Sequence, residues 1–193
     1  MRSALIERRT NETAITLQLY LDGQGDANIA TGLGFLDHML VAFARHGGFD
    51  IELSCEGDLE VDDHHTVEDV ALALGRAFDQ ALVERRGIAR FGHAYAPLDE
   101  ALARVVVDLS GRPSHAVDMG FKRAMIGEVA TENLVHFFQS FATTGRMALH
   151  VDVLKGENDH HRSEAAFKAL ALAMKQAVRL TDRDDVPSTK GVL

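Results

Sequence analysis

Two stretches of the chain, DDHHTVED at residues 62–69 and NDHHRSEA at residues 158–165, contain the same pattern His-His-x-x-Glu. The second copy begins 96 positions after the first, in a chain of 193 residues that has ten histidines. A specific pattern that recurs at about half the chain length indicates an internal duplication. We therefore predict a single domain made of two repeats, about 1–90 and 91–193.

The hydrophobic pattern predicts the same order of strands and helices in both repeats. Alternating apolar residues indicate half-buried strands, and apolar residues three and four positions apart indicate helices with one buried face. The expected elements are, in chain order, a strand at 13–21, a helix at 35–47, a strand at 49–55, a helix at 63–85, strands at 93–96 and 103–109, a helix at 132–145, a strand at 148–154 and a helix at 160–180. The predicted fold is α+β and internally duplicated, and each half forms a mainly antiparallel sheet with helices packed on one face.

Composition and charge limit the classes of function. With 46% hydrophobic and 25% charged residues, the chain is typical of a soluble globular protein. Its net charge of −9 disfavours nucleic acid and anionic membrane surfaces as partners. The single cysteine, Cys55, excludes an internal disulfide, and no apolar run approaches the ~20 residues of a membrane span. Because the N-terminal MRSALIERRT is not typical of a signal or transit peptide, we expect a cytoplasmic protein.

The repeated pattern combines residue types that bind divalent transition metals. On a helix, Glu68 shares a face with His64 or His65, whereas the two adjacent histidines diverge by about 100°. Each His-His-x-x-Glu is therefore expected to serve two different ions. Imidazole and carboxylate donors favour Mn, Fe or Zn, and the lack of thiolates argues against a structural zinc site.

Each repeat also contains a matched histidine upstream of its His-His-x-x-Glu helix, His38 or His136, and these two are 98 positions apart. The complete set of predicted metal ligands is His38, His64, His65, Glu68, His136, His160, His161 and Glu164. Shared equally, these side chains give each of two ions four protein ligands and leave about two positions open in an octahedral site. Open positions are typical of catalytic rather than structural metal sites.

Asp63 and Asp159 directly precede the two histidine pairs and are predicted to cap the helices that begin there. Their negative charge would also favour a cation near a helix start, which the helix dipole alone disfavours. The other four histidines have no repeat partner and are interpreted as surface or structural residues: His46, His93, His115 and His150.

Several motifs together resemble the imidazoleglycerol-phosphate dehydratase family of histidine biosynthesis. They are GLGFLDHML (32–40), DDHHTVED (62–69), PLDEAL (97–102), LSGRP (109–113), NDHHRSEAAFKAL (158–170) and PSTKG (187–191). The resemblance extends from about Arg8 to the C-terminus. It implies a fold of the ribosomal protein S5 domain 2-like type, two manganese ions per active site, and a homo-oligomeric cage of twenty-four subunits with sites between chains.

The resemblance implies a hydro-lyase that converts imidazoleglycerol phosphate to imidazole acetol phosphate and water. The departing hydrogen is on a carbon without an adjacent carbonyl, so we expect the metal ions to drive the elimination. A metal-bound imidazolate would expel the hydroxyl from the carbon attached to the ring. The resulting diazafulvene would then lose the proton to give an enol and finally the ketone.

The resemblance also indicates candidate site residues. Glu12, in RRTNET, is the implied acid/base and a substrate contact, while Glu68 and Glu164 combine metal binding with a catalytic role. The implied phosphate-binding residues are Arg90, Arg112, Ser188 and Lys190. Without the resemblance, Glu12 and the phosphate-binding residues would be interpreted as ordinary exposed side chains. Asp99 and Glu100 lie in a family motif, and we assign them no catalytic role.

The residues leave two other functions open. A two-metal hydrolase would use the same donors with a bridging water as the nucleophile. A metal-storage or ferroxidase protein of the ferritin type would also place Glu-x-x-His-like motifs in a cage. Ferritin-type sites are rich in glutamate and lie in all-α bundles, whereas strands are expected in each half of this chain, so the ferritin alternative is disfavoured.

Overall fold

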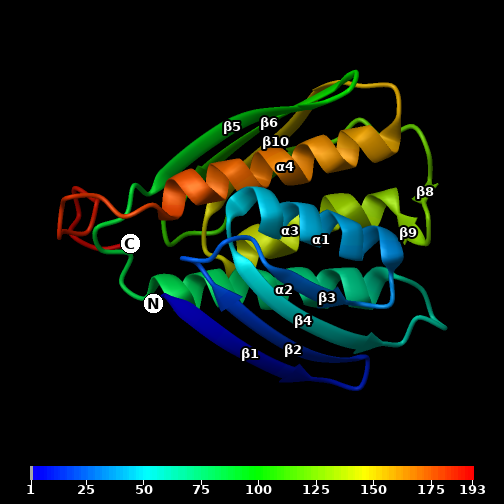
Figure 1. Cartoon of the computed structure of the whole chain (residues 1–193), viewed down its shortest axis with the longest axis horizontal. Helices are drawn as coiled ribbons and strands as arrows, with labels where there is room; N and C mark the ends of the chain where they lie inside the picture. Colours follow the sequence, from blue (N-terminus) through cyan, green and yellow to red (C-terminus); the bar gives the residue numbers. More distant parts are fainter. Residues whose placement is uncertain (1) are drawn as a thin grey trace.

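In the computed structural model, which describes residues 2–193, two four-stranded sheets enclose four long helices (Figure 1). Helices α1 and α2 lie against the first sheet, and α3 and α4 lie against the second. The two helix pairs pack on each other in the middle, with α1 against α4 and α2 against α3. The predicted arrangement, with helices on one face of each sheet, is confirmed.

The elements of the first half are β1 (Ser3–Arg9), β2 (Thr13–Tyr20), β3 (Ala27–Ala30), α1 (Gly34–Gly47), β4 (Asp50–Gly57) and α2 (His64–Leu82). Those of the second half are β5 (Phe91–Leu98), β6 (Ala101–Asp108), β7 (Ser114–Asp118), β8 (Met125–Ile126), β9 (Val129–Ala130), α3 (Thr131–Thr144), β10 (Ala148–Lys155) and α4 (Asp159–Val178). Each predicted helix and strand is present, with ends that differ by a few residues. Within residues 2–193, no helix is long and apolar enough to cross a membrane.

Both sheets have the same topology. Their strand orders are β1-β2-β4-β3 and β5-β6-β10-β7. One pair in each sheet is parallel, β3 with β4 and β7 with β10, and the other pairs are antiparallel. The predicted duplicated, mainly antiparallel α+β fold is therefore confirmed, while the residue at which one repeat ends and the next begins stays a prediction.

The strands that the hydrophobic pattern did not indicate are β1, β3, β7 and the small hairpin β8–β9. The first three are edge strands, and nearly all residues of β3 and β7 are exposed. A strand without a buried face has no alternating pattern, so sequence periodicity could not reveal β3 or β7.

An aromatic cluster holds the helices of the two halves together. Phe43 of α1 and Phe141 of α3 are repeat equivalents, both nearly inaccessible to solvent, and their ring centroids lie 6.2 Å apart. Phe78 of α2 packs edge-on against both, at 5.9 and 5.7 Å. Contact between repeat equivalents shows that the halves face each other, which brings helices from different halves together along their length.

Asp63 lies at the N-cap position of α2, as predicted, but its side chain makes no capping hydrogen bond, and the cap of α4 is Asn158 rather than the predicted Asp159. Asp62 and Asn158 accept the backbone N–H of His64 and His160, at 2.8 and 2.9 Å, through their side chains. An acceptor placed two residues before the N–H it binds is the usual geometry of a cap, which Asp63 and Asp159 do not have here.

Asp63 and Asp159 instead bind the segment that carries β8 and β9. The buried carboxylate of Asp63 accepts the N–H of Ala130 at 2.8 Å, and that of Asp159 accepts the N–H groups of Lys122 and Arg123 at 2.9 and 2.7 Å. The hairpin is thus attached to the starts of both α2 and α4, at the end of the molecule where the histidine pairs lie (Figure 1).

Candidate metal centres

The part of the chain that the structure describes contains two clusters in which histidine and carboxylate ligand atoms lie within 4.8 Å of one another. The first cluster joins His64 and Glu68 of α2 with His136 of α3. Glu68 Oε1 is 3.0 Å from His136 Nε2, and Glu68 Oε2 is 3.7 Å from His64 Nε2. The two imidazole rings are stacked with centroids 5.1 Å apart.

The second cluster joins His38 of α1 with His160 and Glu164 of α4. Glu164 Oε2 lies 3.2 Å from Nε2 of both histidines. Because α1 packs on α4 and α2 packs on α3, each cluster takes one histidine from one half and the His-x-x-x-Glu pair from the other. Six of the eight predicted ligands are therefore brought together, three in each cluster.

The donor set of each cluster suits a divalent transition ion. Two imidazole nitrogens and one carboxylate occupy three positions, and a fourth ligand would still leave open positions in an octahedral site. Asn133 Oδ1 lies 2.9 Å from Nδ1 of His64. Because an amide oxygen only accepts hydrogen bonds, Nδ1 of His64 carries the hydrogen and donates it in this bond, which leaves the lone pair of Nε2 directed at the cluster. The residues therefore fit a bound metal.

His65 and His161 lie outside both clusters, as the divergence of adjacent helical side chains predicts. Nδ1 of His65 is 3.0 Å from Asp58 Oδ2, and Nδ1 of His161 is 2.7 Å from Glu100 Oε2. These hydrogen bonds raise the pKa of both imidazoles above its ordinary value. A carboxylate on Nδ1 is a common partner of metal-binding histidines, because it fixes Nε2 as the free ligand atom. His65 and His161 are thus oriented as ligands without belonging to a cluster of this chain.

Glu12 and Glu100 lie at the tips of equivalent hairpins, just before β2 and β6. Glu100 is fully engaged, and hydrogen bonds from the N–H of Asn158 and from His161 lower its pKa to about 2. The Glu12 carboxylate is half exposed, and its Oε1 lies 3.6 Å from Nε2 of His65. The structure therefore places the predicted acid/base beside a predicted metal ligand, and among residues 2–193 no hydrogen bond occupies its carboxylate oxygens.

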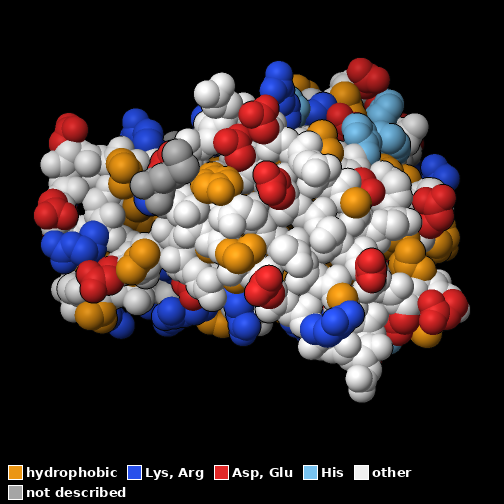
Figure 2. Space-filling view, turned by 60° about the horizontal axis from the view of Figure 1, so that its bottom comes forward, with side chains coloured by type: hydrophobic (Ala, Val, Ile, Leu, Met, Phe, Trp, Pro, Cys, Tyr) orange, Lys and Arg blue, Asp and Glu red, His pale blue; other side chains and the backbone are white. Residues whose placement is uncertain are grey.

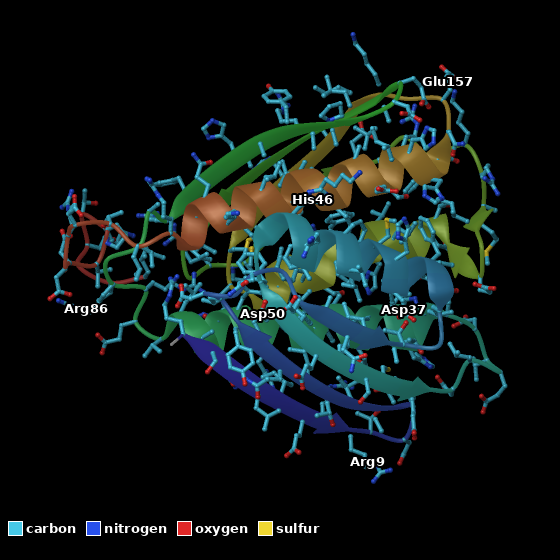
Figure 3. All side chains as sticks on the ribbon, in the orientation of Figure 1. Arg9, Asp37, His46, Asp50, Arg86 and Glu157 are labelled. Carbon is cyan, nitrogen blue, oxygen red and sulfur yellow. The ribbon has the colours of Figure 1, made fainter. Side chains whose placement is uncertain are left out.

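The predicted phosphate-binding residues lie far from both clusters within one chain. The backbone N–H of Arg90 binds the carbonyl of Ala177 near the end of α4, 17 residues from His160, which corresponds to about 26 Å along the helix. Figure 3 shows this separation, with Glu157 near the start of α4 and Arg86 beside the C-terminal segment at the opposite end. The structure does not bring the phosphate-binding residues and the metal ligands into one site.

Arg90 is itself held in place by local partners. Its guanidinium binds both carboxylate oxygens of Asp108, at 2.7 and 3.1 Å, and the carbonyl of Pro187 at 2.7 Å. The Pro187 contact ties the segment that carries Ser188 and Lys190 to Arg90. These three predicted residues are therefore neighbours, although none approaches a metal cluster of the same chain.

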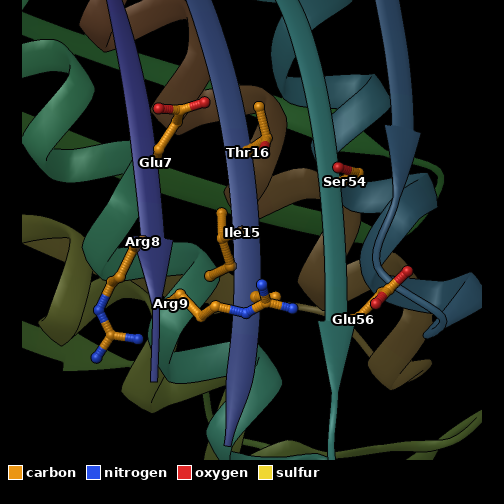
Figure 4. A pocket seen from close by; sticks show the side chains of 8 residues that line it. Glu7, Arg8, Arg9, Ile15, Thr16, Ser54 and Glu56 are labelled. Carbon is orange, nitrogen blue, oxygen red and sulfur yellow. The ribbon is translucent and has the colours of Figure 1, made fainter. Parts of the chain in front are cut away.

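Histidine side chains gather near one end of the face shown in Figure 2, with both acidic and basic side chains around them. The hollow shown in Figure 4 lies elsewhere, on the outer face of the first sheet, and its lining includes Glu7, Arg9, Thr16 and Glu56 but no histidine. The candidate metal ligands are partly accessible to solvent, since the side chains of His38 and His160 are 49% and 41% exposed.

Three residues of the site were not indicated by the sequence pattern. Asp58 and Asn133 orient His65 and His64, and Lys168 Nζ lies 2.7 Å from Glu164 Oε1. Lys168 follows Glu164 by four residues on α4, so its position was accessible from helical spacing. Asp58 and Asn133 lie on other elements, and only the fold brings them to the histidines.

Comparison with known proteins is consistent with this geometry. A model of the imidazoleglycerol-phosphate dehydratase family matches residues 31–174. The chain is 55% identical to the imidazoleglycerol-phosphate dehydratase of Candida glabrata, over 98% of this chain and 99% of that protein. It is 56% identical to that of Roseiflexus sp., over 100% of this chain and 98% of the relative. The chain belongs to the imidazoleglycerol-phosphate dehydratase family.

Solved structures of the family have the same fold. The imidazoleglycerol-phosphate dehydratase of Staphylococcus aureus superposes with a TM-score of 0.84 at 34% identity, covering 93% of this chain and 99% of that one. The enzyme of Pyrococcus furiosus, in complex with (S)-C348, superposes with a TM-score of 0.85 at 39% identity. The match covers 97% of this chain and 100% of that one. The chain is thus a dehydratase and lyase of histidine biosynthesis, as the motifs predicted, and the hydrolase and ferritin alternatives are excluded.

Proposed function

We propose that the dehydratase holds two Mn(II) ions, one at each cluster, and uses them to convert imidazoleglycerol phosphate to imidazole acetol phosphate and water. The observation that carries this proposal is the pair of clusters, each with two imidazoles and one carboxylate within 4.8 Å. When bound, the ions supply Lewis-acid activation of the substrate's imidazole ring and hydroxyl. Glu68 and Glu164 act as the carboxylate ligands that balance the charge of each ion.

We infer that the active sites form between chains of a homo-oligomer, with a cage of twenty-four subunits as the expected assembly. His65 and His161 are oriented as ligands but lie outside the clusters of their own chain. Donated to a neighbouring chain, they would raise the protein ligands of each ion from three to four. The distance of about 26 Å between Arg90 and His160 along α4 also supports a site shared by different chains.

The substrate's phosphate is expected to bind Arg90, Arg112, Ser188 and Lys190 of one subunit while its imidazole faces the ions of others. Arg90 is suited to this function because Asp108 fixes the plane of its guanidinium. Lys190 and Arg112 supply local positive charge on a chain whose net charge is −9. The phosphate thereby fixes the distance of the reacting carbons from the metal centres.

Glu12 is the proposed acid/base for the proton that leaves the carbon next to the ring-attached carbon, which is the one that loses its hydroxyl. Its repeat equivalent Glu100 cannot serve, because both of its oxygens are occupied by hydrogen bonds. The Glu12 carboxylate has no such engagement and lies 3.6 Å from Nε2 of His65. In an assembled site, His65 would bind an ion, so Glu12 would stand beside the reacting groups.

The reaction can be tested directly with purified protein, Mn(II) and imidazoleglycerol phosphate. We expect formation of an enolisable ketone without release of inorganic phosphate, and no product after treatment with a chelator. Re-addition of Mn(II), Fe(II) or Zn(II) to the chelated protein would compare the metals under identical conditions. Highest activity with a metal other than Mn(II) would contradict the metal assignment while leaving the dehydratase reaction intact.

A further inference from the structure

The two equivalent hairpins are attached to the helices in different ways. In the second half, the glutamate at the hairpin tip makes the attachment itself. Glu100 Oε1 accepts the N–H groups of Glu157 and Asn158, at 2.9 and 2.8 Å, and its Oε2 binds His161. Every oxygen of Glu100 is therefore used to hold the hairpin against the start of α4.

In the first half, the attachment is made by a residue of the helix. Asp69 of α2 is only 4% exposed, and its Oδ2 accepts hydrogen bonds from Thr13 Oγ1, at 2.5 Å, and from the Arg8 guanidinium. Thr13 directly follows Glu12, and Arg8 lies on β1. Figure 4 shows the Arg9 side chain lying across the outer face of the sheet, whereas the Arg8 side chain points away from that face.

Asp69 lies on the same helix as the candidate metal ligands His64, His65 and Glu68. Asp69 follows His65 by four residues, so both side chains lie on the same face of α2. The repeat equivalent of Asp69 in α4 is Ala165, whose methyl group cannot accept a hydrogen bond. The aspartate is thus specific to the half in which the hairpin glutamate is left free.

The backbone at the tip of this hairpin is also fixed. Thr10 Oγ1 accepts the N–H groups of Glu12 and Thr13, both at 3.1 Å, and the carbonyl of Glu12 accepts the N–H of Asp58 at 3.1 Å. Asp58 in turn binds His65. The main chain of Glu12 is therefore held at defined positions while its carboxylate stays free.

We infer that Asp69 is a positioning residue for the dehydration, which holds the hairpin on α2 so that the Glu12 carboxylate lies beside His65. This inference rests on the proposed acid/base function of Glu12. In the first half, Asp69 holds the hairpin on its helix, as Glu100 does in the second half. The Glu12 carboxylate is therefore not needed for this contact. Asp69 acts through Thr13 and does not contact the substrate.

A double-mutant cycle between Asp69 and Glu12 tests the inference in the intact Mn(II)-loaded assembly. D69A should lower kcat on the order of a hundredfold, because a displacement of about 1 Å is enough for such a loss. The KM and the Mn(II) content should change little. T13V, which removes the same hydrogen bond from the other side and nearly preserves volume, should reproduce the effect. In an E12Q background, D69A should cause no further loss of kcat.

D69N serves as the conservative variant, because its amide oxygen still accepts the Thr13 hydroxyl, and it should retain more kcat than D69A. D22A is the matched control: it removes the ion pair with Arg2 at the other end of β2 and should leave kcat unchanged. If D69A and E12Q lower kcat by independent factors that multiply, Asp69 does not act through Glu12 and the inference is wrong. Full kcat in E12Q alone would instead overturn the proposed function of Glu12, and the inference with it.

Discussion

His38 and Glu164 are 126 residues apart in the chain, yet Nε2 of His38 and Oε2 of Glu164 lie 3.2 Å apart. His136 and Glu68 repeat this relationship, at 3.0 Å, with the halves exchanged. Each candidate metal centre is therefore a link between the two halves of the fold. Removal of a ligand should affect one centre and leave the other largely intact.

Substitution of the linking histidines tests the two clusters separately. H38A and H136A should each reduce the bound Mn(II) from about two ions per chain to about one, because each removes one of three donors within a cluster. Metal analysis of the purified variants by mass spectrometry gives this number. H46A is the matched control, since His46 lies on the same helix as His38 but outside both clusters, and it should retain both ions. Two bound ions in H38A would contradict the assignment of the second cluster.

His65 and His161 should connect metal binding to assembly. H65A and H161A leave both three-donor clusters intact but remove the ligand that we expect a neighbouring chain to receive. Each variant should lose turnover and should form particles smaller than those of the parent protein, as measured by light scattering coupled to size exclusion. A chelator should produce the same dissociation in the parent protein, and Mn(II) should restore size and activity together. A parent protein that is fully active as a monomer would show that the sites are complete within one chain.

Lys168 should make the two centres unequal in affinity. Its ammonium group lies 2.7 Å from Glu164 Oε1, whereas the equivalent position beside Glu68 is Leu72. A positive charge next to a ligand carboxylate repels a cation, so K168L should tighten one of two Mn(II) sites by roughly tenfold. Titration with Mn(II), followed by the electron paramagnetic resonance of the free ion, distinguishes the two sites. K175L, a matched lysine substitution farther along α4, should leave both affinities unchanged.

The phosphate-binding residues should affect substrate binding without affecting the metals. R112A and K190A each remove a positive charge expected to contact the phosphate, so the KM should rise on the order of tenfold or more while the Mn(II) content stays at the parent value. Steady-state kinetics and metal analysis of the same preparation provide the two numbers. Loss of Mn(II) from either variant would place the residue near the metal ligands instead.

Asp50 should contribute to stability in a pH-dependent way. Its Oδ1 accepts the N–H groups of Gln24, Gly25 and Asp26, at 2.8, 3.0 and 2.9 Å. The hydrogen bonds from Asp26 and then Gln24 lower the pKa of this carboxyl. Since the folded-state pKa is the lower one, the stabilisation is complete above the unfolded-state pKa of about 4 and is lost as the pH falls through the folded-state pKa.

D50A should therefore lower the free energy of unfolding by about 1–2 kcal/mol at neutral pH. The difference between variant and parent should be constant from about pH 5 to pH 8 and should shrink below about pH 4. Thermal unfolding at several pH values measures it. An undiminished difference at pH 3 would show that the loop does not depend on the charged form of Asp50.

The sequence alone was sufficient for the family, the duplicated fold and the histidines and glutamates that meet in the candidate clusters. Local spacing carries this information, because helical periodicity places His64 and Glu68 on one face and separates His64 from His65 by about 100°. The long helices and inner strands also have a buried face, which leaves a pattern in the sequence. The exposed edge strands β3 and β7 have no such pattern, and they were missed.

Only the tertiary structure decided which histidine joins which glutamate. His38 could have paired with Glu68 of its own half, but α1 packs on α4 and α2 packs on α3, so each cluster combines both halves. The hydrogen bonds that Asp58, Glu100 and Asp69 make were likewise not indicated by the sequence, because hydrogen bonds between side chains on different elements leave no periodic pattern in the chain. The separation of Arg90 from His160 depends on the length and direction of α4 within the fold. The sequence determines which histidine and glutamate side chains are available and in which directions adjacent side chains on one helix point. The packing of distant helices determines which of these side chains come together in one cluster.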